Sequence, residues 1–126
     1  MATTDDALGV LIAEDNSLVL MSLEGLLEDL EWRLIGPART LDAALRLAER
    51  DDIDVALLDV NLGDQVSHSV ADRLRARGIP FLFATGDADH TNLPAHLRDA
   101  ELIAKPYALD DLEGALRRLA AGAPSA

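Results

Sequence analysis

The sequence predicts a three-layer α/β fold in which a five-stranded parallel sheet is covered by helices on both faces. The first indication is a set of apolar runs of three or four residues, which is typical of strands buried on both faces. The second is that these runs alternate with longer stretches whose apolar residues recur at helical spacing. The expected strands are 10–13, 33–36, 55–58, 81–84 and 102–104.

The stretches between the expected strands carry apolar residues three and four positions apart, which line one face of a helix. The residues expected to face the core are Val19, Leu23, Leu26, Leu27 and Leu30 in the first helix, Leu41, Ala44, Leu45 and Ala48 in the second, Val66, Val70, Ala71 and Leu74 in the third, and Leu112, Ala115, Leu116 and Leu119 in the last. Thr40 is the expected N-cap of the second helix, because its hydroxyl accepts a hydrogen bond from a free backbone N–H. Gly78 supplies the left-handed stop of the third helix.

The segment 87–100 has a weaker helical pattern than the others. Pro94 falls inside it, and only Leu93 and Leu97 repeat at helical spacing. We therefore expect a short or irregular fourth helix there. The small residues of 121–126 predict a frayed tail.

Length and composition favour a single acidic domain, 1–126, with its core in 9–119. The chain has 126 residues, 49% of them apolar, which is enough for one hydrophobic core. The formal net charge of -12 would repel nucleic-acid phosphates, so no nucleic-acid partner is expected. The absence of cysteine fits a reducing compartment. The polar N-terminus and the lack of a membrane-length apolar run favour a cytoplasmic protein without membrane contact.

Chemically distinctive residues directly follow four of the five expected strands. They are Glu14 and Asp15, Asp59, Thr85 with Gly86, and Lys105 with Pro106. Because carboxyl ends of parallel strands lie along one edge of the sheet, these residues are expected to share one cleft. The strand 33–36 lacks such a residue, which fits an edge strand.

The set predicts a magnesium-dependent phosphoryl-acceptor site. Mg²⁺ is usually held by one or two carboxylates plus a phosphate, and Asp15 and Asp59 supply such carboxylates. Glu14 would reach the ion through a water, and the backbone carbonyl of Asn61 would complete the protein ligands. Asp59 is the expected nucleophile, since a carboxylate forms an aspartyl phosphate in ATPases. Lys105 would offset the added charge.

The Thr85 hydroxyl would donate to a phosphoryl oxygen. Each element alone has an ordinary explanation, such as a solvated strand end, a loop acid, a turn pair or an exposed lysine. Their occurrence in order at four strands of one sheet favours the site.

Other features carry less weight. His68, His90 and His96 lack metal-ligand spacing, so we expect exposed histidines and no zinc site. The turn after the first strand is not glycine-rich, which argues against a nucleotide-binding site. Leu18 and Met21, with Gly25, form a second stripe on the first helix, and the stripe is either scattered surface residues or a docking patch.

The ordered set resembles a response-regulator receiver domain of two-component signalling, over residues 9–119. The resemblance rests on Glu14 and Asp15, on Asp59 in Ala-Leu-Leu-Asp-Val-Asn, on Thr85 in Phe-Ala-Thr-Gly, and on Lys105 in Lys-Pro-Tyr. It implies a flavodoxin-like (βα)5 fold with strand order 2-1-3-4-5 and a cis Lys105–Pro106 bond. It also implies Mg²⁺ binding and transfer of phosphate from a phosphohistidine to Asp59.

One position departs from the family pattern. Receivers commonly carry Tyr or Phe three residues before the lysine, where this chain has Leu102. With Phe-Ala-Thr-Gly and the weak fourth helix, this resembles a subgroup of single-domain receivers found in alphaproteobacteria. That subgroup usually has a Tyr soon after the glycine, where this chain has Asp87 and Ala88.

The expected function is therefore that of a stand-alone receiver, which catalyses only its own phosphorylation and dephosphorylation. Its partners would be a sensor histidine kinase or phosphotransfer protein, docking beside the first helix, and a downstream protein, with the receiver itself a monomer or weak homodimer. One alternative is a pseudo-receiver that binds partners without phosphorylation. A second is an aspartate-nucleophile phosphatase, although such enzymes normally carry a second Asp at the position of Asn61.

Overall fold

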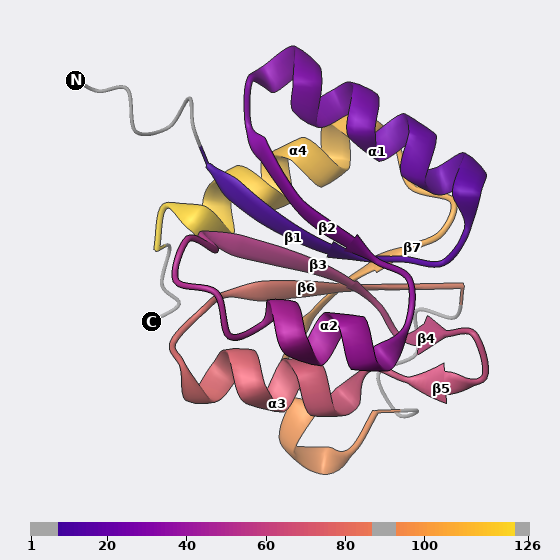
Figure 1. Cartoon of the computed structure of the whole chain (residues 1–126), viewed down its shortest axis with the longest axis vertical. Coiled ribbons are helices and arrows are strands. Elements are labelled where there is room, and N and C mark those ends of the chain that lie inside the picture. Colours follow the sequence, from indigo (N-terminus) through magenta and orange to yellow (C-terminus); the bar gives the residue numbers. More distant parts are fainter. Residues whose placement is uncertain (1–7, 87–92, 123–126) are drawn as a thin grey trace.

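The computed structural model describes residues 8–86 and 93–122 and contains the expected parallel sheet (Figure 1). The strands of the main sheet are β1 (Gly9–Ala13), β2 (Arg33–Ala38), β3 (Val55–Asp59), β6 (Phe81–Thr85) and β7 (Glu101–Ala104). Their order across the sheet is β2-β1-β3-β6-β7, and every neighbouring pair is parallel. The predicted order 2-1-3-4-5 is confirmed, and all carboxyl strand ends lie along one edge.

Helices cover both faces of the sheet, as predicted. They are α1 (Ser17–Leu30), α2 (Leu41–Leu47), α3 (His68–Ala76), the 3-10 turn η3 (Ala95–Leu97) and α4 (Leu109–Ala120). Helices α1 and α4 lie on one face, and α2 and α3 lie on the other (Figure 1). Burial of the strands between two apolar cores explains why their sequences are continuous apolar runs.

The helix ends follow the local signals. Thr40 accepts from the backbone N–H of Ala43 at 3.2 Å, which confirms it as an N-cap. Asn16 caps α1 by accepting from two backbone N–H groups. Gly78 has a φ of 74°, the left-handed conformation expected after α3. The Lys105–Pro106 bond is cis, as the resemblance implied.

Each strand of the main sheet differs from prediction at one bound. Strand β1 begins at Gly9, β3 ends at Asp59 and β6 ends at Thr85, each one residue beyond the expected range. Strand β2 continues through Pro37 to Ala38 instead of ending at Gly36. Proline is compatible with this position because β2 is an edge strand and can leave the proline nitrogen unpaired. Strand β7 begins one residue early, at Glu101.

A short hairpin between β3 and α3 was not predicted. Its strands are β4 (Asn61–Leu62) and β5 (Gln65–Val66), paired antiparallel with Gly63 at a φ of 63° in the turn. The prediction that Val66 faces the core from the third helix was wrong. Val66 lies in β5 and is exposed, because the hairpin delays the start of α3 to His68.

The segment between β6 and β7 is irregular where the structure describes it. Its described part is the turn η3, and Leu93 and Leu97 are buried as expected. Residues 87–92, the N-terminal residues 1–7 and the predicted frayed tail beyond Gly122 lie outside the described residues. Among the described helices, none is long and apolar enough to cross a membrane.

Candidate functional site

Three carboxylates meet at the carboxyl edge of the sheet. Glu14 and Asp15 follow β1, and Asp59 is the last residue of β3, the neighbouring strand. One carboxylate oxygen from each lies within 4.8 Å of the others. Glu14 is 2% and Asp59 6% exposed, whereas Asp15 is half-buried. Such a cluster of acids concentrates negative charge where water is scarce, so it needs a cation close by.

Lys105 supplies a cation from the end of β7. Its Nζ donates to Asp59 Oδ2 at 2.7 Å and lies 3.3 Å from Glu14 Oε1. Burial alone would lower the pKa of Lys105, but the hydrogen bond and attraction from Asp59, with a further contribution from Glu14, raise it overall. The ammonium therefore stays charged and bridges two of the three acids.

Glu14 is the acid most affected by its surroundings. Burial raises its pKa above the ordinary range, and repulsion by Asp59 adds to the rise. The backbone N–H of Asn16, which donates to Glu14 Oε2 at 3.0 Å, and the Lys105 ammonium act in the opposite direction. The balance favours adding positive charge to the cluster.

Thr85 ends the strand that neighbours Asp59 in the sheet, and Asn61 lies two residues after Asp59. Thr85 is the buried last residue of β6, and its carbonyl accepts from the Lys105 backbone N–H at 2.8 Å. Asn61, at the start of β4, donates its backbone N–H to Asp59 Oδ1 at 3.2 Å. Both oxygens of the Asp59 carboxylate therefore accept a hydrogen bond.

The unpredicted hairpin β4–β5 braces this edge. It returns the chain to Ser67, whose hydroxyl donates to the Asp59 carbonyl at 2.7 Å. At the hairpin tip, the Gly63 N–H donates to Asp15 Oδ2 at 2.8 Å. Sequence reasoning missed Ser67 and the hairpin. The glycine of Leu-Gly-Asp was the available turn signal.

Arg39 was missed as well. Its Nη2 donates to the Asp15 carbonyl at 3.1 Å and to Ser17 Oγ at 3.0 Å. The residue directly follows β2, but β2 was expected to stop at Gly36, three residues earlier. The tolerance of edge strands for Pro37 was the signal that would have placed Arg39 at the site.

A mainly apolar pocket of about 420 Å³ adjoins Lys105. It is lined by Val19, Ser22, Leu23, Lys105, Pro106, Tyr107 and Leu109. The Tyr107 hydroxyl is buried without a hydrogen-bond partner among the described residues, and burial, with the charge of Glu14, raises its pKa to about 12. On α1, which contributes Val19 to the pocket, Leu18 and Met21 are 75% and 66% exposed.

The histidines behave differently from one another. His96 is exposed as predicted, and its Nε2 lies 2.7 Å from Asp72 Oδ1. The prediction for His68 was wrong, because this residue is half-buried with its ring edge-on to Phe83 at 6.3 Å. His90 lies outside the described residues.

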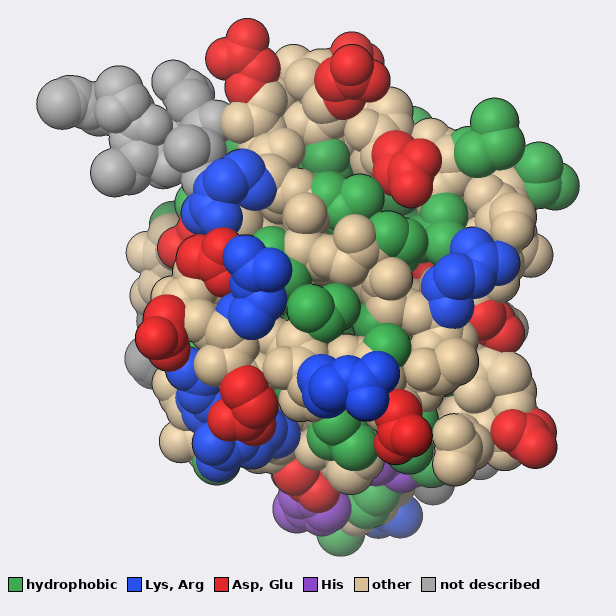
Figure 2. Space-filling view, viewed as in Figure 1, with side chains coloured by type: hydrophobic (Ala, Val, Ile, Leu, Met, Phe, Trp, Pro, Cys, Tyr) green, Lys and Arg blue, Asp and Glu red, His purple; other side chains and the backbone are tan. Residues whose placement is uncertain are grey.

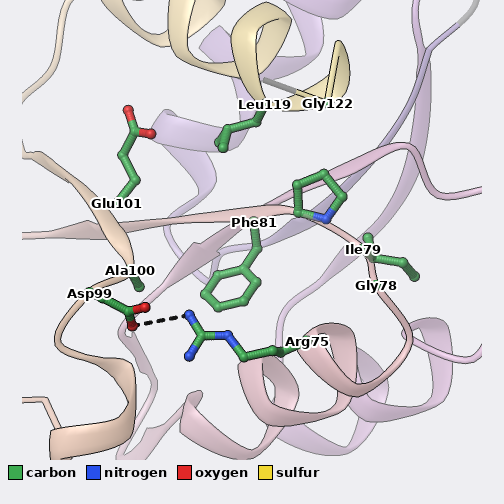
Figure 3. Close-up of a pocket in the computed structure, with 10 residues that line it drawn as sticks. Arg75, Gly78, Ile79, Phe81, Asp99, Ala100, Glu101, Leu119 and Gly122 are labelled. Atoms are coloured by element: carbon green, nitrogen blue, oxygen red, sulfur yellow. Dashed lines mark hydrogen bonds and ion pairs between the residues drawn. The ribbon is translucent and has the colours of Figure 1, made fainter. Parts of the chain in front are cut away.

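A second hollow, of about 490 Å³, lies at the opposite edge of the sheet (Figure 3). Phe81 and Glu101, the first residues of β6 and β7, contribute to its lining. Arg75 spans it, pairing with Asp99 at 3.3 Å and lying 5.5 Å from the centre of the Phe81 ring. The acidic cluster and this hollow are therefore separated by the length of the strands.

A parallel sheet of this order, with acids, a threonine and a lysine at its carboxyl edge, defines the receiver class of signalling proteins. The family described as the response regulator receiver domain matches residues 10–117. The chain therefore belongs to the response-regulator receiver family, which confirms the resemblance inferred from its motifs.

The chain is similar to two alphaproteobacterial-type regulators. It is 36% identical over 106 residues to the phyllosphere-induced regulator PhyR of Methylorubrum extorquens, covering 82% of this chain and 40% of PhyR. The solution structure of SdrG from Sphingomonas melonis Fr1 superimposes with a TM-score of 0.77 at 40% identity, covering 94% of this chain and 98% of SdrG. A BeF3-activated conformation of SdrG gives a TM-score of 0.73 at 38% identity, with 94% and 99% covered. The chain spans about half the length of the curated relatives it matches.

Proposed function

We propose that this receiver accepts a phosphoryl group on Asp59 from a histidine kinase or phosphotransfer protein and signals through a phosphorylation-dependent protein contact. The observation that carries the proposal is the cluster of Glu14, Asp15 and Asp59 within 4.8 Å, with Lys105 Nζ 2.7 Å from Asp59. A carboxylate held between acids and a cation is suited to receive a dianionic group once further positive charge is present.

The residues of the cluster fit Mg²⁺. Their hard oxygen donors are the type this ion prefers, and their mutual repulsion favours a divalent cation. In our proposal Asp15, Asp59 and the Asn61 backbone carbonyl hold Mg²⁺, and Glu14 acts through a water. The bound ion would offset the charge that develops on the transferred group.

Transfer is a displacement at phosphorus. An Asp59 carboxylate oxygen bonds to phosphorus as the bond from phosphorus to the donor imidazole nitrogen breaks, and the electron pair stays with the imidazole. Lys105 moves its hydrogen bond from Asp59 to a phosphoryl oxygen, and the Thr85 hydroxyl donates to another. Hydrolysis of the aspartyl phosphate removes the charge of the phosphoryl group from the site again.

The similarity to SdrG supports the proposal. That protein takes up a BeF3-activated conformation, and beryllofluoride is a phosphoryl mimic. Its 38% identity to this chain extends over 94% of the residues.

Incubation with acetyl phosphate tests the function. Intact mass should show one added phosphoryl group when Mg²⁺ is present and none when it is chelated. A protein that stays unlabelled while Mg²⁺ leaves its melting temperature unchanged would be a pseudo-receiver. Continued turnover of an added phosphate ester would instead support the phosphatase.

Mg²⁺ should stabilise the fold. At ten times its Kd, the ion contributes about 1.4 kcal/mol, which raises the melting temperature by about 5 °C. The shift should nearly vanish in Asp15→Asn, whose amide oxygen can still accept from Gly63. Asp51→Asn, exposed at the opposite edge, should keep the full shift. Equal shifts in all variants at matched ionic strength would contradict the metal assignment.

The exposed stripe of α1 is the proposed docking site of the phosphodonor protein. Leu18 and Met21 are exposed on α1, the helix that also contributes residues to the pocket beside Lys105, and exposed apolar side chains near a reactive site favour a protein partner. For any histidine kinase that labels the wild type, Met21→Glu should slow transfer by tenfold or more, on the order of one buried methionine contact. Labelling by acetyl phosphate should be unchanged, and an equal loss with both donors would argue against docking here.

A further inference from the structure

Basic side chains are unevenly distributed over this acidic molecule. Helices α2, α3 and α4 carry arginines in their last turns, at the amino edge of the sheet. Figure 2 shows Lys and Arg side chains gathered mainly over the side where α3 ends. Among the residues that directly follow the described strands, Arg39 and Lys105 are the basic ones. Lys105 already belongs to the site, whereas Arg39 has no role in it so far.

Arg39 is held beside the acids by one end of its side chain. Its Nη2 donates to the Asp15 carbonyl and to Ser17 Oγ, and the preceding Ala38 carbonyl accepts from the Glu14 N–H at 2.9 Å. The loops after β1 and β2 are therefore joined at this point. The position of the guanidinium is fixed relative to the carboxylates, unlike that of a free surface arginine.

The rest of the guanidinium remains available. Arg39 is exposed, and within residues 8–86 and 93–122 no hydrogen bond or ion pair engages its Nη1 or Nε. A guanidinium offers five N–H donors and keeps its charge at any physiological pH, and it suits phosphate groups in particular. Arg39 thus presents a fixed, unneutralised cation next to the mouth of an acidic site.

We propose that Arg39 is an accessory residue that attracts the anionic phosphodonor to Asp59. The inference rests on the proposed function and adds to it a residue that the family motif does not include. The donor must approach three carboxylates on a chain of net charge -12, so a cation at the entrance lowers the barrier to encounter.

The Arg39 guanidinium is close enough to Asp59 for its charge to act on an approaching anion. Arg39 Nη2 is 3.1 Å from the Asp15 carbonyl, and the Asp15 carboxylate is within 4.8 Å of that of Asp59. These contacts place the guanidinium on the order of 10 Å from the reacting carboxylate, about one Debye length at 0.1 M ionic strength. For a dianion near a protein surface, Coulomb's law then gives a rate effect of about three- to tenfold.

The charge role and a purely structural role predict opposite effects on metal binding. If Arg39 acts through charge, its removal slows an anionic donor but leaves Mg²⁺ binding unchanged or tighter, because a cation near a cation site is lost. If it only braces the loop that carries Asp15, its removal weakens Mg²⁺ binding and slows labelling together. Two measurements on one variant therefore separate the roles.

The experiment compares the full chain with Arg39→Gln, Arg39→Lys and the control Arg46→Gln. Arg46 is exposed in the last turn of α2, away from the acids, and its variant makes the same charge change. Labelling rates with acetyl phosphate are followed by intact mass at saturating Mg²⁺, at 0.1 M and 1 M ionic strength. Mg²⁺ affinity is measured by calorimetric titration, and a thermal melt checks folding.

We expect Arg39→Gln to be about three- to tenfold slower at 0.1 M and closer to wild type at 1 M, where the Debye length falls to about 3 Å. Arg39→Lys and Arg46→Gln should stay within about twofold of wild type, and Mg²⁺ affinity should not fall in Arg39→Gln. Equal rates for Arg39→Gln and wild type would overturn the inference, as would slow labelling of Arg39→Gln together with weakened Mg²⁺ binding. An unlabelled wild type would overturn the proposed function itself.

Discussion

Replacing Asp59 with asparagine is expected to abolish phosphorylation by acetyl phosphate while leaving the fold intact. The amide has no carboxylate oxygen to attack phosphorus, so the loss should be complete within the detection limit of intact mass. The variant should fold because the amide oxygen can still accept from the Asn61 N–H, and Lys105 keeps Glu14 as a partner. Removing one acid from the cluster also relieves repulsion of Glu14.

Asp64→Asn is a suitable control for this experiment. Asp64 is exposed between the hairpin strands β4 and β5 and makes the same change of charge close to the site. It should be labelled like the wild type. Labelling of Asp59→Asn at the wild-type level would show that the phosphoryl group goes to another residue.

Among the single substitutions proposed for this chain, Lys105→Met is expected to cause the largest loss of folding stability. Lys105 bridges Asp59 and Glu14, whose side chains are 8% and 3% exposed. Without the ammonium, two buried carboxylates lose their cation, and breaking such a pair costs about 3 kcal/mol. Urea unfolding at neutral pH without Mg²⁺ measures the loss.

Two conditions should restore stability to Lys105→Met. Mg²⁺ should stabilise this variant more than the wild type, because the acids have lost their internal cation. Acidification should help as well. The pKa of Glu14 is already raised, chiefly by burial, so its charge opposes folding at neutral pH, and that cost disappears as the pH falls through the folded-state pKa.

The double variant Asp59→Asn/Lys105→Met supplies the control. It removes one acid together with the cation, so it should be more stable than the sum of the single changes implies. Simple additivity, with no response of Lys105→Met to Mg²⁺ or acid, would show that Lys105 does not neutralise the cluster.

The sequence predicted the parts of the site that depend on strand ends. A buried parallel strand is a continuous apolar run, so the polar residue that ends it is visible without a structure. Asp59, Thr85 and Lys105 were found in this way, and the edge they share follows from parallel topology. The structure brings Glu14, Asp15, Asp59 and Lys105 together as expected.

The features that were missed depend on short-range geometry with weak sequence signals. The hairpin strands β4 and β5 have two residues each, too few for a visible alternation of apolar and polar residues. Ser67 was missed because it contacts Asp59 only when the hairpin folds back, and the hairpin was not predicted. Arg39 was not predicted as a site residue because Pro37 indicates the end of a strand, unless the strand is known to lie at the sheet edge.

The half-burial of His68 has a similar origin. Its position beside Phe83 follows from where α3 starts, and that start is set by the hairpin. At Leu102, which lies opposite Phe83 in the register of β6 and β7, the structure shows a side chain packed against the core on the α3 face. A leucine there has no polar tip to exchange between solvent and cleft, so movement of Thr85 would be transmitted through the backbone.

Reductive trapping of the labelled protein shows directly whether Asp59 carries the phosphoryl group. After incubation with acetyl phosphate and Mg²⁺, borohydride converts an aspartyl phosphate to homoserine, and peptide mass spectrometry locates the changed residue. We expect homoserine at position 59 alone and none when Mg²⁺ is chelated. Homoserine at another aspartate, or an unchanged Asp59 in protein that carries phosphate, would contradict this expectation.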